Sequence, residues 1–126
     1  MQPEESRYDR GLGGMRAIFG PGIESALKGL AATSPDLARF LVEFPFADIY
    51  SRPGLDLKTR EMLTVAALTV LGYPQAELKE HIQGALNVGC TCDEILEIIL
   101  QMAVYAGFPA ALEAIKTAAA VFGEKQ

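Results

Sequence analysis

Hydrophobic residues recur along this chain at the three- and four-residue spacing of helices, and no stretch alternates with the period of two that strands show. Turn residues divide the pattern into seven segments. The predicted helices cover residues 7–19, 23–30, 35–44, 57–71, 75–88, 91–105 and 109–123. The expected fold class is therefore all-α, with six to seven helices.

Several helix ends carry recognisable signals. Ser34 precedes Pro35 as an N-cap before a first-turn proline, and Asp56 caps the next helix. The segment Thr91-Cys92-Asp93-Glu94 fits a capping box. Gly107 is expected to end one helix in a left-handed conformation, and Pro109 to start the next.

The connection Gly72-Tyr73-Pro74 is too short for anything but a tight turn. It makes the helices predicted over residues 57–71 and 75–88 antiparallel neighbours. We expect this hairpin to lie at the centre of the fold.

A length of 126 residues suits one domain with one sizeable core. Half of the residues are hydrophobic and 21% are charged, which is apolar for so small a chain. The segments MLTVAALTVL and ILEIILQMAVY are apolar on nearly every helical face. Both features favour a homo-oligomer in which part of this surface is covered.

Charge and hydropathy exclude several classes of function. The net charge of −5, without a cluster of Lys or Arg, argues against nucleic-acid binding. Apolar runs stay shorter than the roughly 18 residues that cross a bilayer, and no secretory signal pattern opens the chain. A C-x-C pair is no extracellular disulfide framework. We expect a soluble, cytoplasmic protein without membrane contact.

Glu61 and the single histidine, His81, occupy matching levels of the predicted hairpin. Each lies about 10–15 Å from the turn at 1.5 Å per residue. A carboxylate facing an imidazole can orient the ring, favour its protonated form and act with it in acid/base catalysis. The alternative is that both are surface residues on unrelated faces.

Cys90 and Cys92 stand at the start of a predicted helix, where amide donors and the helix dipole lower a thiol pKa. That placement would suit redox chemistry. However, the C-x-C spacing differs from the usual C-x-x-C, and two thiols are too few for a metal site. The alternative is that both simply pack at the helix entrance.

Several single positive residues surround the hairpin in sequence and could hold a carboxylate substrate, since Arg binds carboxylates through two parallel hydrogen bonds. The alternative is ordinary surface charge. These residues are Arg39, Arg52, Lys58, Arg60 and Lys79.

Two long segments, PDLARFLVEFPFADIYSRPGLDLKTREMLTVAALTVLG and HIQGALNVGCTCDEILEIILQMAVYAGFPAALEAIKTAAAVF, resemble the two halves of the carboxymuconolactone decarboxylase family. The likeness covers residues 34–122 as the core, and residues 1–33 only weakly. It implies one domain over residues 1–126 with an alkylhydroperoxidase-D-like all-α fold, and a homo-oligomer that is typically hexameric.

The resemblance also implies an activity. The members that give the family its name decarboxylate 4-carboxymuconolactone in aromatic catabolism, without a metal or an organic cofactor. Their acid and histidine fall on Glu61 and His81 here. His81 is the candidate proton donor and Glu61 its orienting partner. Arg52 and Arg60 are candidates for binding the carboxylates of a small-molecule substrate.

A sister branch of the superfamily reduces peroxides with a C-x-x-C placed between the equivalents of Glu61 and His81. Here that interval, MLTVAALTVLGYPQAELKE, has no cysteine. The leading hypothesis is thus a cofactor-free lyase acting on a small carboxylated lactone. A thiol-dependent peroxidase using Cys90 and Cys92 is the alternative. A different small-molecule reaction and a non-catalytic oligomer also stay open.

Overall fold

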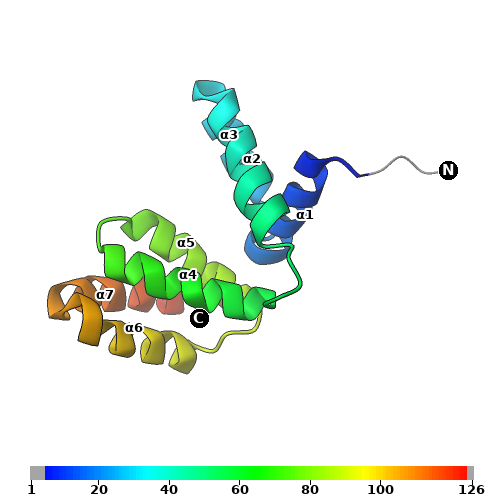
Figure 1. Cartoon of the computed structure of the whole chain (residues 1–126). Helices are drawn as coiled ribbons and strands as arrows, with labels where there is room; N and C mark the ends of the chain where they lie inside the picture. The colour runs from blue at the N-terminus through cyan, green and yellow to red at the C-terminus, as the bar shows by residue number, and fades with distance from the viewer. Residues whose placement is uncertain (1–4, 125–126) are drawn as a thin grey trace. The chain divides into compact units, whose positions relative to one another are not determined.

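The computed structural model describes residues 5–124, which form seven α-helices and one π-helix and contain no strand (Figure 1). The all-α class predicted from the hydrophobic pattern is confirmed. Among these described residues, no helix is long and apolar enough to cross a membrane.

The chain divides into two compact units, one ending at Leu55 and one beginning at Asp56. Each unit has its own buried residues and is described by itself. The expectation that residues 1–126 act as one domain stays a prediction.

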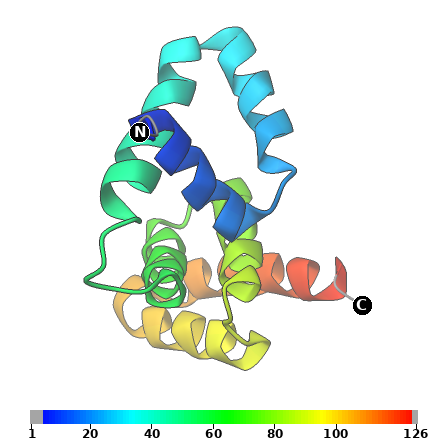
Figure 2. The same cartoon turned by 90° about the vertical axis from the view of Figure 1, so that its right-hand side faces the viewer.

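The first unit contains three α-helices followed by a π-helix. They are α1 (Arg7–Phe19), α2 (Ile23–Thr33), α3 (Pro35–Leu41) and η1 (Val42–Ile49). Helix α1 runs alongside η1 (Figure 2). Its glycines permit this approach, because a Cβ at Gly11 would lie 2.1 Å from the carbonyl oxygen of Val42. Across the same contact, Nε of Arg7 donates to the Asp48 carboxylate at 2.9 Å.

The π-helix corrects the prediction of one continuous α-helix over residues 35–44. Pro45 lies inside η1 and has no N–H, so it cannot contribute a donor to an α-helical ladder. The N–H of Tyr50 instead donates to the carbonyl of Pro45 at 2.8 Å, five residues earlier. The pattern of hydrophobic residues carries no signal for that wider turn.

The second unit consists of four helices: α4 (Leu57–Leu71), α5 (Gln75–Asn87), α6 (Cys92–Ala106) and α7 (Phe108–Glu124). Helices α4 and α5 form the predicted antiparallel hairpin, α6 packs on α4, and α7 packs against both α5 and α6 (Figure 1). Val65, Leu78, Ile82, Ile95 and Ile99 are almost completely buried and form the centre of this core.

The predicted helix caps are present. Asp56 accepts from the N–H of Thr59 at 2.8 Å, and Ser34 accepts from that of Leu37 at 3.3 Å. Thr91 and Glu94 form both hydrogen bonds of the capping box. These caps fix where α3, α4 and α6 begin.

The turn between α6 and α7 differs from the prediction in one respect. Gly107 has the expected positive φ of 88°, but its ψ of 166° is extended rather than left-handed helical. Helix α7 begins at Phe108, so Pro109 lies in its first turn, as predicted. The chain thus bends sharply at a conformation that favours glycine.

Candidate active site

Glu61 of α4 and His81 of α5 face each other across the hairpin. Nδ1 of His81 lies 2.9 Å from Oε2 and 3.2 Å from Oε1 of Glu61. Counting residues from the turn predicted that Glu61 and His81 lie at the same level of the hairpin, and the observed contact agrees with this prediction. The alternative, in which the two residues lie on unrelated faces, does not fit the contact. The catalytic role of the pair stays a prediction.

The two partners differ in their access to water. The Glu61 side chain is completely buried, whereas 17% of the His81 side chain is exposed. A hydrogen bond to a charged group is stronger where water is excluded. The pair thus combines a carboxylate shielded from solvent with a ring that solvent can reach.

The sequence of α4 explains why an acid is buried. Glu61, Val65 and Thr69 are the buried residues of this helix and follow one another at intervals of four, so they share one face. Thr69 satisfies its hydroxyl by donating to the Val65 carbonyl at 2.7 Å. The Glu61 carboxylate has His81 as a partner, so this face buries polar groups with their hydrogen bonds made.

The hydrogen bond also constrains the histidine ring. An ionised carboxylate can only accept, so Nδ1 of His81 carries a proton when it bonds to Glu61. The opposite ring nitrogen, Nε2, is then the atom through which the imidazole exchanges a proton with a substrate. The geometry suits an acid/base group whose orientation is held by a carboxylate.

The candidate cations have different surroundings. Arg60 directly precedes Glu61 on α4 and is partly buried. Arg52 is exposed and belongs to the first unit, in the turn after η1, where its N–H donates to the Ile49 carbonyl at 3.1 Å. The role of both residues in substrate binding stays a prediction.

The remaining positive residues near the hairpin in sequence are held in ion pairs. Nζ of Lys58 lies 3.1 Å from Oε2 of Glu94, and Nζ of Lys79 lies 2.9 Å from Oε1 of Glu124. Arg39 is in the first unit and lies 3.7 Å from Asp36. The ordinary surface-charge interpretation fits these three residues.

The Lys58–Glu94 pair was not anticipated from the sequence. It links the first turn of α4 to the first turn of α6. The hydrogen bond from the Thr91 backbone and the interaction with Lys58 lower the pKa of Glu94. The capping box in the sequence places Glu94 at a helix start. It does not reveal that a cation of another helix lies beside Glu94.

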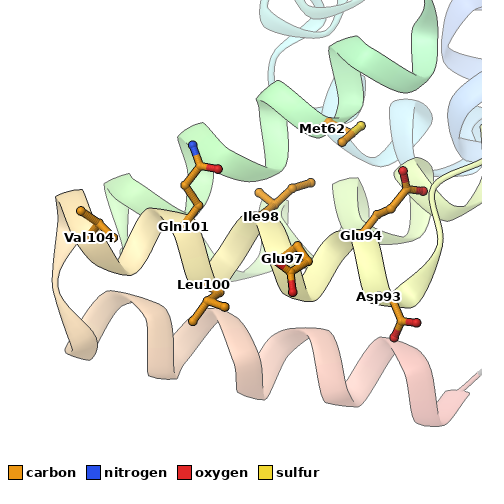
Figure 3. Close-up of a pocket in the computed structure, with 8 residues that line it drawn as sticks. All are labelled: Met62, Asp93, Glu94, Glu97, Ile98, Leu100, Gln101 and Val104. Carbon is orange, nitrogen blue, oxygen red and sulfur yellow. The ribbon is translucent and has the colours of Figure 1, made fainter.

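A surface hollow of about 540 Å³ lies over α4 and α6 (Figure 3). Four apolar side chains, three acids and one amide line this hollow. They are Met62, Ile98, Leu100 and Val104, then Asp93, Glu94 and Glu97, and finally Gln101. The lining includes neither Glu61 nor His81, and it contains no arginine or lysine. An acidic hollow is unsuited to a substrate with several carboxylates.

The cysteines do not form a disulfide, and their environments differ. Cys90 is buried in the core of the second unit, with Sγ 4.0 Å from the carbonyl oxygen of Lys58. Burial raises the pKa of the Cys90 thiol, opposite to the lowering expected at a helix start. Cys92 is exposed on the first turn of α6. Cys90 therefore fits the packing interpretation.

The family model for carboxymuconolactone decarboxylases matches residues 35–120. The chain belongs to this family. It is 36% identical over 120 residues to 4-carboxymuconolactone decarboxylase of Acinetobacter baylyi, covering 94% of this chain and 89% of that protein. It is 33% identical over 109 residues to nitrosuccinic acid decarboxylase of Metarhizium robertsii, covering 86% of this chain and 76% of that protein.

An uncharacterised 15.0 kDa protein of Paracoccus denitrificans is 34% identical over 113 residues, covering 88% of this chain and 84% of that protein. The two relatives with a stated activity are both decarboxylases. This agreement supports the expectation that the chain is an enzyme of the decarboxylase type.

Proposed function

We propose that the chain removes CO2 from a small carboxylated lactone resembling 4-carboxymuconolactone, with His81 as the proton donor and Glu61 as its orienting partner. The observation that carries this proposal is the contact between the buried Glu61 carboxylate and Nδ1 of His81. The named activities of the Acinetobacter and Metarhizium relatives support the reaction type.

The chemistry requires an electron acceptor within the substrate. When the carbon–carboxylate bond breaks, its electron pair stays on carbon and must delocalise. An unsaturated lactone carbonyl or a nitro group, the latter present in nitrosuccinic acid, can take up that pair. The substrate class we propose is therefore a small acid with its departing carboxylate next to, or conjugated with, such a group.

His81 completes the reaction by delivering a proton from Nε2 to the carbanionic carbon. One proton is consumed for each CO2 released, so the ring must be reprotonated from water. Its partial exposure supplies that contact. Glu61 holds Nδ1 and stabilises the positive ring before transfer, which keeps Nε2 directed in one orientation.

Arg60 is proposed to bind the carboxylate that is retained, because it is a partly buried cation of the same unit as Glu61 and His81. The binding role of Arg52, which belongs to the first unit, stays the prediction made from the sequence. A guanidinium matches a carboxylate through two parallel hydrogen bonds.

Participation in aromatic-compound catabolism and a cytoplasmic location stay predictions.

The test is CO2 release from 4-carboxymuconolactone and from nitrosuccinate by the purified protein. We expect turnover of at least one substrate, and a loss of about 100-fold or more in His81→Ala, the usual scale for an acid/base group. The double variant Cys90→Ser, Cys92→Ser should stay within a few-fold of wild type. Loss of activity on removing the thiols, with His81→Ala active, would assign the chemistry to the cysteines instead.

A further inference from the structure

The loop of residues 88–91 between α5 and α6, which we name the α5–α6 loop, lies against the first turn of α4. The carbonyl oxygen of Lys58 on α4 is 4.0 Å from Sγ of Cys90 in this loop. The Lys58 side chain runs beside Gly89, where an added Cβ would lie 3.9 Å from its Cδ atom. Its ammonium group reaches Glu94 in the first turn of α6, with 3.1 Å between Nζ and Oε2. One lysine of α4 therefore contacts both the loop and the helix that follows it.

The Glu94 carboxylate joins this ion pair to the start of α6. Its Oε2 atom pairs with Lys58, and its Oε1 atom accepts from the N–H of Thr91 at 2.9 Å. Figure 3 shows the Glu94 side chain extending from α6 toward α4. On the α5 side, the N–H of Cys90 donates to the Ala85 carbonyl at 2.9 Å. The loop is thus fixed to α4, α5 and α6 at the same time.

The loop and its ion pair lie next to the buried acid of the candidate active site. Lys58 precedes Glu61 by three positions on α4, so the two side chains are neighbours on the helix surface. Burial is the main cause that raises the pKa of the Cys90 thiol, and the charges of Glu94 and Glu61 raise it further. Cys90 therefore lies within electrostatic reach of Glu61. Since Glu61 is only in the second turn of α4, its complete burial depends on the segments that cover this end of the helix.

We propose that the Lys58–Glu94 ion pair holds the α5–α6 loop closed over the start of α4 and thereby keeps the Glu61 carboxylate dry. A dry carboxylate holds the His81 ring more firmly, since a hydrogen bond to a charge is stronger where the local dielectric is low. Lys58 is thus a positioning residue, which acts through the loop and not on the substrate. Its consequence for catalysis rests on the proposed function, in which Glu61 orients His81.

The ion pair is too exposed to contribute much to global stability. The Lys58 and Glu94 side chains are 38% and 36% exposed, and such pairs typically stabilise a fold little. What the pair controls is a local opening, which is separate from unfolding of the core. Lys79 offers a matched control, because its ion pair with Glu124 joins α5 to α7 and is similarly exposed. Only loss of the Lys58 pair should release the loop.

The first experiment measures loop opening through the reactivity of Cys90. In a Cys92→Ser background Cys90 is the one remaining thiol, so its labelling rate reports how often the loop exposes it. Lys58→Met keeps the apolar length of the side chain without its charge. It should accelerate labelling about fivefold, the upper range for a partly exposed ion pair. Lys58→Arg and Lys79→Met should label at the wild-type rate, and circular dichroism verifies that each variant is folded.

The second experiment follows the histidine. The NMR resonances of the His81 ring should shift in Lys58→Met and stay in place in Lys79→Met. Glu94→Gln breaks the same ion pair with the opposite change of charge, so it should shift them in the same direction as Lys58→Met. On a substrate that wild type decarboxylates, Lys58→Met should lower kcat at least about fivefold and leave KM within about twofold, because a misplaced acid/base group affects the transition state more than binding. Lys58→Arg should recover kcat.

Wild-type labelling of Cys90 in Lys58→Met, or equal acceleration in Lys79→Met, would overturn the proposal. Opposite shifts of the His81 resonances in Lys58→Met and Glu94→Gln would do the same, because they indicate a direct effect of charge without loop opening. So would an unchanged kcat beside faster labelling. If wild type releases CO2 from neither substrate, the proposed function fails, while the labelling and the resonances still decide whether Lys58 closes the loop and positions His81.

Discussion

The Glu61 carboxylate, with none of its side chain exposed, lies 2.9 Å from Nδ1 of a histidine that reaches solvent. Glu61 depends on His81 to satisfy a charge that water does not contact. His81 depends on Glu61 for its orientation. Removing one partner should therefore not be equivalent to removing the other.

His81→Ala should lower the free energy of unfolding by about 1–3 kcal/mol, because it leaves a buried carboxylate without this partner. Adding Glu61→Leu should recover part of that loss, since the buried charge is then gone. Urea unfolding at pH 7 measures both. Glu77→Ala, an exposed acid one turn before His81, is the control and should change stability by no more than about 0.5 kcal/mol. A His81→Ala variant as stable as wild type would contradict the described contact.

The cysteines should react at very different rates. Cys92 is exposed, whereas Cys90 is buried and its thiol pKa is raised by that burial. A thiol reagent at pH 7 should label one equivalent quickly and the second only on unfolding. Cys92→Ser should abolish the fast phase, and Cys90→Ser should retain it. Fast labelling of Cys90 in the folded protein would reopen the thiol hypothesis.

Two glycines of α1 provide a matched pair. Gly11→Ala places a methyl group against the Val42 backbone and should cost about 1–3 kcal/mol, the range for overpacking. At Gly13 a Cβ meets nothing within 4 Å, so Gly13→Ala should stabilise the helix by about 0.5–1 kcal/mol. Thermal unfolding measures both changes in stability, which should have opposite signs. Equal effects would show that α1 and η1 are further apart than described.

Asp48 makes the first unit sensitive to acid. The Arg7 hydrogen bond lowers the pKa of Asp48 below its ordinary value, so the unfolded chain binds a proton at a higher pH than the folded one. The contribution of the pair to stability is thus present above the ordinary Asp pKa of about 3.9 and is lost as pH falls through the folded pKa. The stability difference between wild type and Asp48→Asn should shrink over that range in acid unfolding. Asp36→Asn, at an acid of the same unit whose side chain is 82% exposed, serves as the comparison.

Much of the helical fold follows from local signals. Asp56, Thr91 and Gly107 mark helix ends through chemistry confined to a few neighbouring residues, so sequence alone could place those ends. The Glu61–His81 contact was also accessible, because a tight turn and a fixed rise per residue determine which positions face each other. The sequence alone could not predict the complete burial of Glu61, because this burial depends on packing from other helices.

Other features depend on partners that are distant in sequence. The π-helix around Pro45 lies in the segment that packs on α1, and the hydrophobic pattern is similar for either helix type. The high thiol pKa of Cys90 reflects the core that surrounds it, whereas the helix-start argument considered only its neighbours in sequence. The apolar segments predicted an oligomer in which their surface is covered, and the structure shows which of their side chains a single chain leaves exposed, among them Leu63, Leu100 and Val104.

His81 is the chain's one histidine, and its ring is held at the Nδ1 edge by a buried acid. An untagged preparation will therefore show imidazole NMR resonances from a single residue, without isotope editing to separate sites. Following those resonances while substrate is consumed would report directly whether the ring is charged in the resting enzyme. The same spectra would reveal the fraction of protein in each protonation state during turnover.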